Sequence, residues 1–181
     1  MRRLSDAGFT LIELLVVVAI IGIIAATAAP GLLRARIAGN EASAIGSLRT
    51  VNSSQQAYMS TCGHGFFASS LVILGDPAPS GAAFISPDLG MAAVVNKSGY
   101  QLTLEEGSEA AAAIDNGCNP SGTAANLFSS YVASNQPLAA GVTGTRWFWT
   151  NSLGTVWSSS ADDFDASTVG NAPPGAGAVL Q

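Results

Sequence analysis

The sequence has few charged residues and few residues suited to catalysis. Charged residues make up 10% of the 181 residues, against about 25% in an average soluble protein. His64 is the only histidine and lies in a Gly-rich stretch, so a Ser-His-Asp triad is not expected. The formal net charge is -5. Nucleic-acid binders normally carry a basic patch, so a nucleic-acid partner is not expected. The scarcity of catalytic residue types means that an enzyme is not expected either.

Cysteine is also scarce. Cys62 and Cys118 are the only two, and they allow one intramolecular pair. If this part of the chain lies outside the cytoplasm, a Cys62–Cys118 disulfide is expected, with two free thiols as the alternative. The segment Cys62-Gly63-His64 lacks the paired ligand spacing of zinc sites, so a zinc site is not expected.

A metal site has one weak candidate. Asp162, Asp163 and Asp165 gather the hard oxygen ligands that calcium prefers. Their spacing fits no EF-hand loop, and a solvated acidic turn is the simpler interpretation. We therefore expect no cofactor, with calcium as an open alternative.

One long apolar run stands out against this background. It extends from Phe9 to Leu33, and Glu13 is its only charged residue. About 20 apolar residues in a helix span the hydrocarbon core of a bilayer, roughly 30 Å thick. Arg2 and Arg3 precede the run, which favours a cytoplasmic N-terminus and places the rest of the chain across the membrane.

The segment from Arg34 to Ser60 continues the helix as an amphipathic one. Its apolar residues recur mostly every three or four positions, which is typical of a single apolar stripe. The stripe comprises Leu33, Ile37, Ile45, Leu48 and Val51. Four charged residues are expected to face water, namely Arg34, Arg36, Glu41 and Arg49. The sequence thus predicts one helix from about Phe9 to about Ser60, kinked near Pro30.

After Cys62 the composition changes to Gly, Pro, Ser and Ala with short strand-like runs. Alternation and aromatic residues predict strands at Gly99–Leu104, Phe128–Ala133, Thr145–Thr150 and Thr155–Trp157, with a hairpin turn at Asn151–Gly154 and a loop at Gly75–Ala83. Trp147, Phe148, Trp149 and Trp157 are expected in the core, alternate residues facing inward, rather than in an exposed recognition patch. The acidic, then Pro- and Gly-rich tail is expected to be poorly ordered.

Glu13 is the most informative residue. A charged side chain within a bilayer costs about 2.5–3.5 kcal/mol and tends to mark a function. Snorkelling to the headgroups is the simpler alternative, although a carboxylate on a short stem does this less well than lysine or arginine. No Lys or Arg occurs from Leu14 to Leu33, but a cut immediately before Phe9 would create a free amine as the partner.

The segment Gly8-Phe9-Thr10-Leu11-Ile12-Glu13-Leu14-Leu15-Val16 resembles the class III signal of type IV pilins and type II secretion pseudopilins. The resemblance implies that a prepilin peptidase cuts between Gly8 and Phe9 and methylates the new amine. Glu13 of one subunit would then pair with Phe9 of a neighbour. Pro30 also matches the family, and the segment from Gly22 to Pro30 is expected to lose helicity on assembly.

The resemblance also implies the fold, the partners and the location. The fold class is α+β and pilin-like, a long N-terminal α-helix with a small antiparallel β-sheet head. The expected segments are a cleaved leader (1–8), a transmembrane and filament-core helix (9–33), its amphipathic half (34–61), a globular head (62–161) and a flexible tail (162–181). The expected partners are further copies in a helical homopolymer, the lipid bilayer, prepilin peptidase, and an inner-membrane assembly platform with its ATPase. The precursor would be a single-pass inner-membrane protein with a periplasmic head. It would serve either an extracellular pilus, for adhesion or motility, or a periplasmic pseudopilus.

Two other interpretations stay open. Met1–Ala28 can be parsed as a conventional signal peptide ending in Ala26-Thr27-Ala28, which would release a soluble binding protein or enzyme that begins at Ala29. Glu13 and the length of the apolar run oppose this, because signal-peptide cores usually have 7–15 apolar residues. An uncut, single-span anchor explains the apolar run but leaves Glu13 without a partner.

Overall fold

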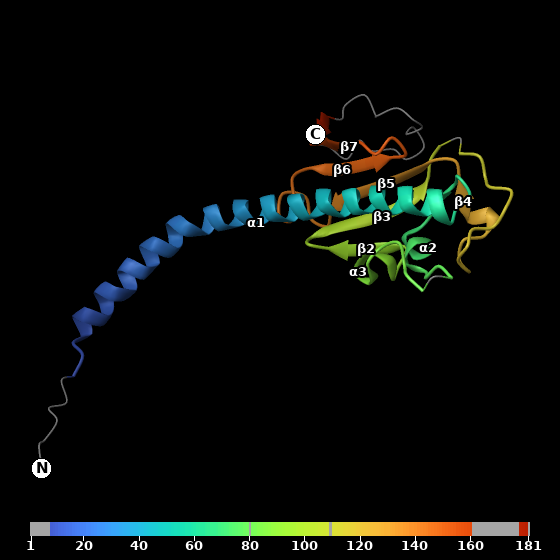
Figure 1. Cartoon of the computed structure of the whole chain (residues 1–181). Coiled ribbons are helices and arrows are strands. Elements are labelled where there is room, and N and C mark those ends of the chain that lie inside the picture. The colour runs from blue at the N-terminus through green and yellow to red at the C-terminus, as the bar shows by residue number, and fades with distance from the viewer. Residues whose placement is uncertain (1–7, 80, 109, 161–177, 181) are drawn as a thin grey trace, which may run out of the picture. The chain divides into compact units, whose positions relative to one another are not determined.

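The computed structural model describes residues 8–79, 81–108, 110–160 and 178–180 (Figure 1). The chain divides into two compact units, Met1–Arg36 and Ile37–Gln181. In the described residues of the first unit, the only regular element is the N-terminal part of helix α1. Within its described residues, the second unit contains the rest of α1, all of the strands, two short α-helices and one 3-10 turn.

Helix α1 runs from Leu11 to Thr61, 51 residues, and continues through Pro30. The prediction of one long helix is therefore confirmed, with its start two residues later and its end one residue later. A kink is expected at Pro30 because proline lacks the backbone N–H that an interior helical residue donates. This kink stays a prediction. By length and composition α1 can cross a membrane.

The second unit is built on one antiparallel sheet of six strands in the order β2-β3-β5-β6-β7-β8. The strands are β2 (Val94–Lys97), β3 (Tyr100–Glu106), β5 (Tyr131–Pro137), β6 (Trp147–Asn151), β7 (Val156–Ser159) and β8 (Ala178–Leu180). A separate pair joins β1 (Phe67–Ala68) to β4 (Leu127–Phe128), and the short helices are α2 (Leu71–Gly75), α3 (Pro87–Gly90) and the 3-10 turn η1 (Ala124–Asn126). This is the expected α+β, pilin-like fold.

The strands depart from the sequence prediction in several places. Strand β1 was not predicted, and the strand predicted at Phe128–Ala133 is divided between β4 and β5. Strand β2 was not predicted; it pairs with β3 through a tight turn in which Ser98 and Gly99 have φ values of 48° and 73°. Such left-handed pairs suit the twist of a two-residue hairpin. Of the tail that was expected to be poorly ordered, Ala178–Leu180 form β8 against β7, and the rest lies outside the described residues. Ala178–Leu180 pair with β7, which the composition of the tail did not predict.

The main core lies between the second half of α1 and one face of the sheet. Figure 1 shows this part of α1 lying along β3 and β5. Leu48, Val51 and Tyr58 of the helix are fully buried. They belong to one core cluster with Tyr100 and Phe148, which come from the sheet.

The burial of β6 differs from the expected alternation. Phe148 and Trp149 are consecutive and therefore point to opposite faces, yet their side chains are 1% and 0% exposed. Phe148 belongs to the core beneath α1, whereas Trp149 and Trp157 lie outside that cluster and pair with each other across β6 and β7. Both faces of the sheet are thus buried at β6. Phe148, Trp149 and Trp157 are buried as expected, whereas Trp147 at the start of β6 is only partly buried.

Candidate functional site

The residues predicted for processing stand at the exposed start of α1. Gly8 and Phe9 precede the helix, and the Phe9 side chain is 82% exposed. Thr10 and Glu13 close the first turn. The Thr10 N–H and hydroxyl donate to Glu13 Oε2 at 3.0 and 2.7 Å, and the Glu13 N–H donates to Thr10 Oγ1 at 3.3 Å. This reciprocal pattern is a capping box, which satisfies helix N–H groups that lack an intrahelical partner.

The capping box gives Glu13 a local role that the sequence prediction missed. The signal was readable, because Thr10-Leu11-Ile12-Glu13 fits the Thr-x-x-Glu pattern. Within the described residues, no cation forms an ion pair with Glu13. Hydrogen bonds from Thr10 leave the charge of the carboxylate uncompensated, so a cation from outside this chain would still lower its cost in a bilayer.

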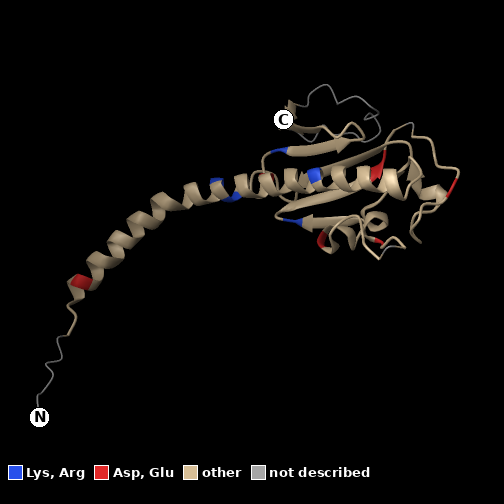
Figure 2. Ribbon diagram, viewed as in Figure 1, with Lys and Arg blue, Asp and Glu red and all other residues tan. Residues whose placement is uncertain are grey.

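The apolar part of α1 is exposed on every side. Every residue from Leu11 to Arg36 is exposed, including large side chains such as Ile12, Ile23 and Leu32 at 69%, 67% and 73%. Between Glu13 and Arg34 this surface carries no charge (Figure 2). A helix that is apolar all round requires lipid or protein to cover it.

The N-terminal residues match a known sequence family. Residues 3–29 match the family model of the prokaryotic N-terminal methylation motif. The chain carries the class III signal of type IV pilins and pseudopilins. The methylation motif covers Gly8, Phe9 and Glu13, the residues on which the sequence prediction rested. Comparisons with curated proteins and with solved structures found no match to the chain.

A disulfide and a buried polar network close the far end of α1. Cys62 and Cys118 are bonded, 56 positions apart in the sequence. Beside them the Tyr58 hydroxyl donates to Asn119 Oδ1 at 3.0 Å, and Asn119 Nδ2 donates to the carbonyl of Ile73 at 2.6 Å. Burial, with the nearby charge of Asp76, raises the pKa of Tyr58 to about 12, so the hydroxyl stays a donor. The network ties α1 to the segment that carries Cys118.

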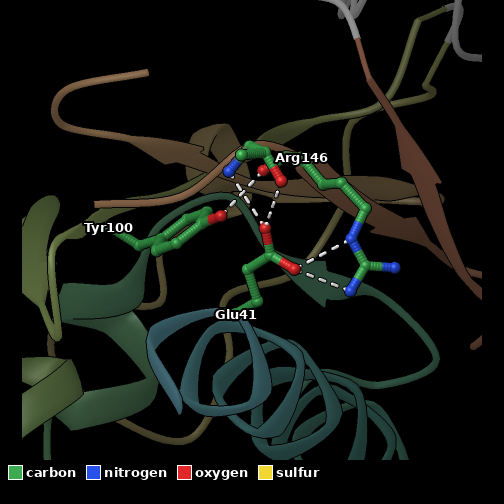
Figure 3. Close-up of polar contacts among 4 residues, drawn as sticks. Glu41, Tyr100 and Arg146 are labelled. Atoms are coloured by element: carbon green, nitrogen blue, oxygen red, sulfur yellow. Dashed lines mark hydrogen bonds and ion pairs between the residues drawn. The ribbon is translucent and has the colours of Figure 1, made fainter. Parts of the chain in front are cut away.

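Glu41 anchors α1 to the start of β6, as Figure 3 shows. Glu41 Oε1 accepts from the N–H and the hydroxyl of Thr145, both at 2.9 Å. Glu41 Oε2 accepts from Nε and Nη2 of Arg146 at 2.9 and 2.7 Å. The Tyr100 hydroxyl completes the group by donating to the Arg146 carbonyl at 2.9 Å. We call Glu41, Tyr100, Thr145 and Arg146 the Glu41 cluster.

The Glu41 cluster corrects the expectation that Glu41 faces water, because the residue is only 5% exposed. Burial opposes the charged form, but the donors on Thr145 and the guanidinium of Arg146 outweigh it and hold the pKa of Glu41 below its usual value. Helical periodicity could not reveal this, since the partners lie 104 and 105 positions away.

Other predicted site residues are placed as follows. The apolar stripe on α1 is interrupted by buried polar side chains such as Asn52 and Gln55, the latter fully buried. A Cβ at Gly22 would meet no atom within 4 Å, so nothing in this unit requires glycine there. The calcium candidates Asp162, Asp163 and Asp165 lie outside the described residues. Among the described residues no group of three or more acidic, His or Cys side chains could hold a metal ion.

Proposed function

We propose that the chain is a structural subunit of a type IV pilus or a type II secretion pseudopilus. In this proposal, prepilin peptidase cuts the precursor after Gly8 and methylates Phe9, and the mature subunits polymerise through α1. The observation that carries the proposal is the methylation motif placed on a helix whose apolar residues are exposed on all sides.

The second unit forms a core of its own, and this supports a structural role. Its own core is closed by Leu48, Val51 and Tyr58, so it does not need the apolar segment before Leu33 for burial. That segment is free to cross a bilayer as a precursor and to pack against other copies afterwards. Small residues such as Ala19, Gly22 and Ala25 allow close approach of helices there.

The charges at the start of α1 support the proposed register between subunits. A cut after Gly8 would leave a cationic amine on Phe9, and methylation retains that charge. Glu13 is the only acidic residue from Phe9 to Leu33, so in this region it alone can be the acidic partner of that amine. Pairing the two charges between neighbours would offset the cost of each in a low-dielectric filament core.

The remaining partners follow from this proposal. The precursor would sit in the inner membrane with its second unit in the periplasm, where a disulfide can form. An assembly platform and its ATPase would lift subunits from the bilayer into the filament. Loss of surface fibres in cells lacking the gene would assign a pilus, and loss of protein secretion would assign a pseudopilus.

The mature N-terminus tests the proposal directly. Mass spectrometry of the protein purified from its native membrane is expected to find a chain that begins at Phe9 with one added methyl group. A chain that begins at Ala29 would identify a secreted soluble protein and overturn the proposal. A chain that still begins at Met1 would favour a simple membrane anchor or a host that lacks the peptidase.

A further inference from the structure

Two arginines mark the end of the apolar part of α1. From Leu14 to Leu33 the helix carries no charged residue, and Arg34 and Arg36 follow directly. Both side chains are exposed. An α-helix turns by about 100° per residue, so a separation of two positions places the arginines about 200° apart around the helix axis. A partner that binds both must therefore surround the helix, because the two side chains leave it on opposite sides.

Neither arginine forms an ion pair among the described residues. An ion pair along a helix surface needs an acidic residue three or four positions away, and the sequence places none there for Arg34 or Arg36. Glu13 lies 21 positions before Arg34, at the other end of the uncharged segment. Glu41, the next acidic residue in the chain, already accepts from Nε and Nη2 of Arg146. The two guanidinium groups are thus available to an anion from outside the chain.

The spacing of the charges along α1 matches the thickness of a bilayer. The uncharged helical segment Leu14–Leu33 rises about 30 Å, which is roughly the thickness of the hydrocarbon core. When Glu13 lies at the inner boundary of the core, Arg34 therefore lies at the outer boundary, next to the lipid phosphates. Gly8 and Phe9 precede Glu13 by five and four positions, so they fall in the inner headgroup layer, roughly 5–8 Å thick.

The chemistry of arginine suits this level of the bilayer. A guanidinium group presents its N–H donors in a planar fork, which can donate two parallel hydrogen bonds to two oxygens of one phosphate. Long basic side chains also keep their methylene stems on apolar surface while the charged end reaches the interface. Because every phospholipid headgroup contains a phosphate, such binding does not require a lipid of net negative charge.

We propose that, before assembly, Arg34 and Arg36 bind phosphates of the outer leaflet from two sides of α1 and thereby fix the depth of the helix in the bilayer. The partner is a phospholipid surface. Movement of α1 outward would carry Glu13 into the hydrocarbon core, and movement inward would bury the arginines, both at a cost. A fixed depth holds the bond between Gly8 and Phe9 at the inner surface, where a peptidase can reach it. The inference rests on the proposed function, because the apolar part of α1 must lie in a bilayer.

Solid-state NMR of the full chain in phospholipid nanodiscs, with one chain per disc, tests the contact. Dephasing of guanidinium carbon signals by lipid phosphorus reports a phosphate within hydrogen-bonding range. Arg34→Lys and Arg36→Lys each keep the charge but remove one guanidinium, so each should remove part of the dephased signal, in zwitterionic and anionic lipid alike. Arg146→Lys is the matched control and should remove none of it, because Arg146 is bound by Glu41. Full dephasing in both Arg34→Lys and Arg36→Lys would overturn the proposal.

Thiol alkylation in the same nanodiscs tests the depth of the helix. Ala35→Cys lies between the two arginines and Ala25→Cys within the uncharged segment, and both positions are exposed in the structure. Cys62 and Cys118 are bonded to each other, so only the introduced thiol reacts. A charged maleimide, which does not enter the core, should alkylate position 35 rapidly and position 25 slowly. Replacing both arginines by leucine should slow alkylation at position 35 several-fold, and an unchanged rate there would overturn the proposal.

The Ala25→Cys chain separates failure of this inference from failure of the proposed function. Rapid alkylation at position 25 would show that the apolar segment lies outside the bilayer, which would overturn its placement in the proposed function together with this inference. Slow alkylation at position 25, with no effect of the arginine substitutions on dephasing or on alkylation at position 35, would overturn this inference alone. The proposed filament role would then stand without it.

Discussion

The two units of the chain use one helix in opposite ways. In the first unit α1 exposes its apolar side chains, with Leu32 at 73%, whereas in the second unit Leu48 of the same helix is fully buried. The first stretch is covered only when lipid or other copies surround it, and the second is covered by its own sheet. Substitutions in the first should therefore alter association, and substitutions in the second should alter folding.

The largest expected effect is on filament yield, and it comes from substitution of Glu13 in the first unit. Glu13→Leu should abolish assembly, because it removes the proposed partner of the Phe9 amine, while membrane insertion and unfolding of the second unit stay unchanged. Glu13→Gln is the sharper variant, since it can still accept from the Thr10 N–H but carries no charge. Sheared fibres or cross-linked oligomers, quantified against total subunit, measure the outcome. Full assembly by Glu13→Gln would mean that Glu13 serves as a helix cap.

Removal of the disulfide should cost the second unit about 2–5 kcal/mol. Cys62 and Cys118 close a loop across 56 positions, so the oxidised unfolded chain is strongly constrained. The double variant Cys62→Ser with Cys118→Ser avoids a leftover thiol and can be compared with wild type by urea unfolding followed through tryptophan fluorescence. Equal midpoints for wild type with and without reductant would contradict the prediction.

A pair of leucines on α1 tests the division of roles directly. Leu48→Ala should destabilise the second unit by about 2–5 kcal/mol, because it opens a cavity at a fully buried position. Leu32→Ala, the matched control, should leave the unfolding curve unchanged and act only on assembly. Urea midpoints for both variants, measured with the same detergent, decide this. A shift for Leu32→Ala as large as that for Leu48→Ala would show that the two stretches of α1 fold together.

The smallest expected effect is a change in pH dependence. The pKa of Glu41 is lowered in the folded state, so its stabilising contribution is present above the unfolded pKa, about 4.3, and is lost as pH falls through the lower folded value. Glu41→Gln should remove this part of the acid sensitivity and lower stability near neutral pH. Unfolding curves between about pH 2 and 7 test it. Parallel pH profiles for wild type and Glu41→Gln would refute the role of the charge.

Local patterns in the chain were enough for several features. The long apolar run predicted the first half of α1, and the segment from Gly8 to Glu13 identified the methylation motif. Alternation and aromatic content located β3, β6 and β7 to within a few residues. These features depend on periodicity, turn residues or short motifs, which neighbouring residues suffice to set. The capping box of Thr10 and Glu13 belongs with them, although the prediction overlooked it.

Other features were decided by contacts between distant segments. Glu41 became buried because Thr145 and Arg146, more than 100 positions away, supply the donors that offset its desolvation. Phe148 and Trp149 are both buried because β6 lies inside the sheet with both faces covered. Strand β8 exists because β7 offers it an edge. Residue type and spacing fix the first helix and its signal, whereas polar burial and strand pairing depend on partners that only the folded chain brings together.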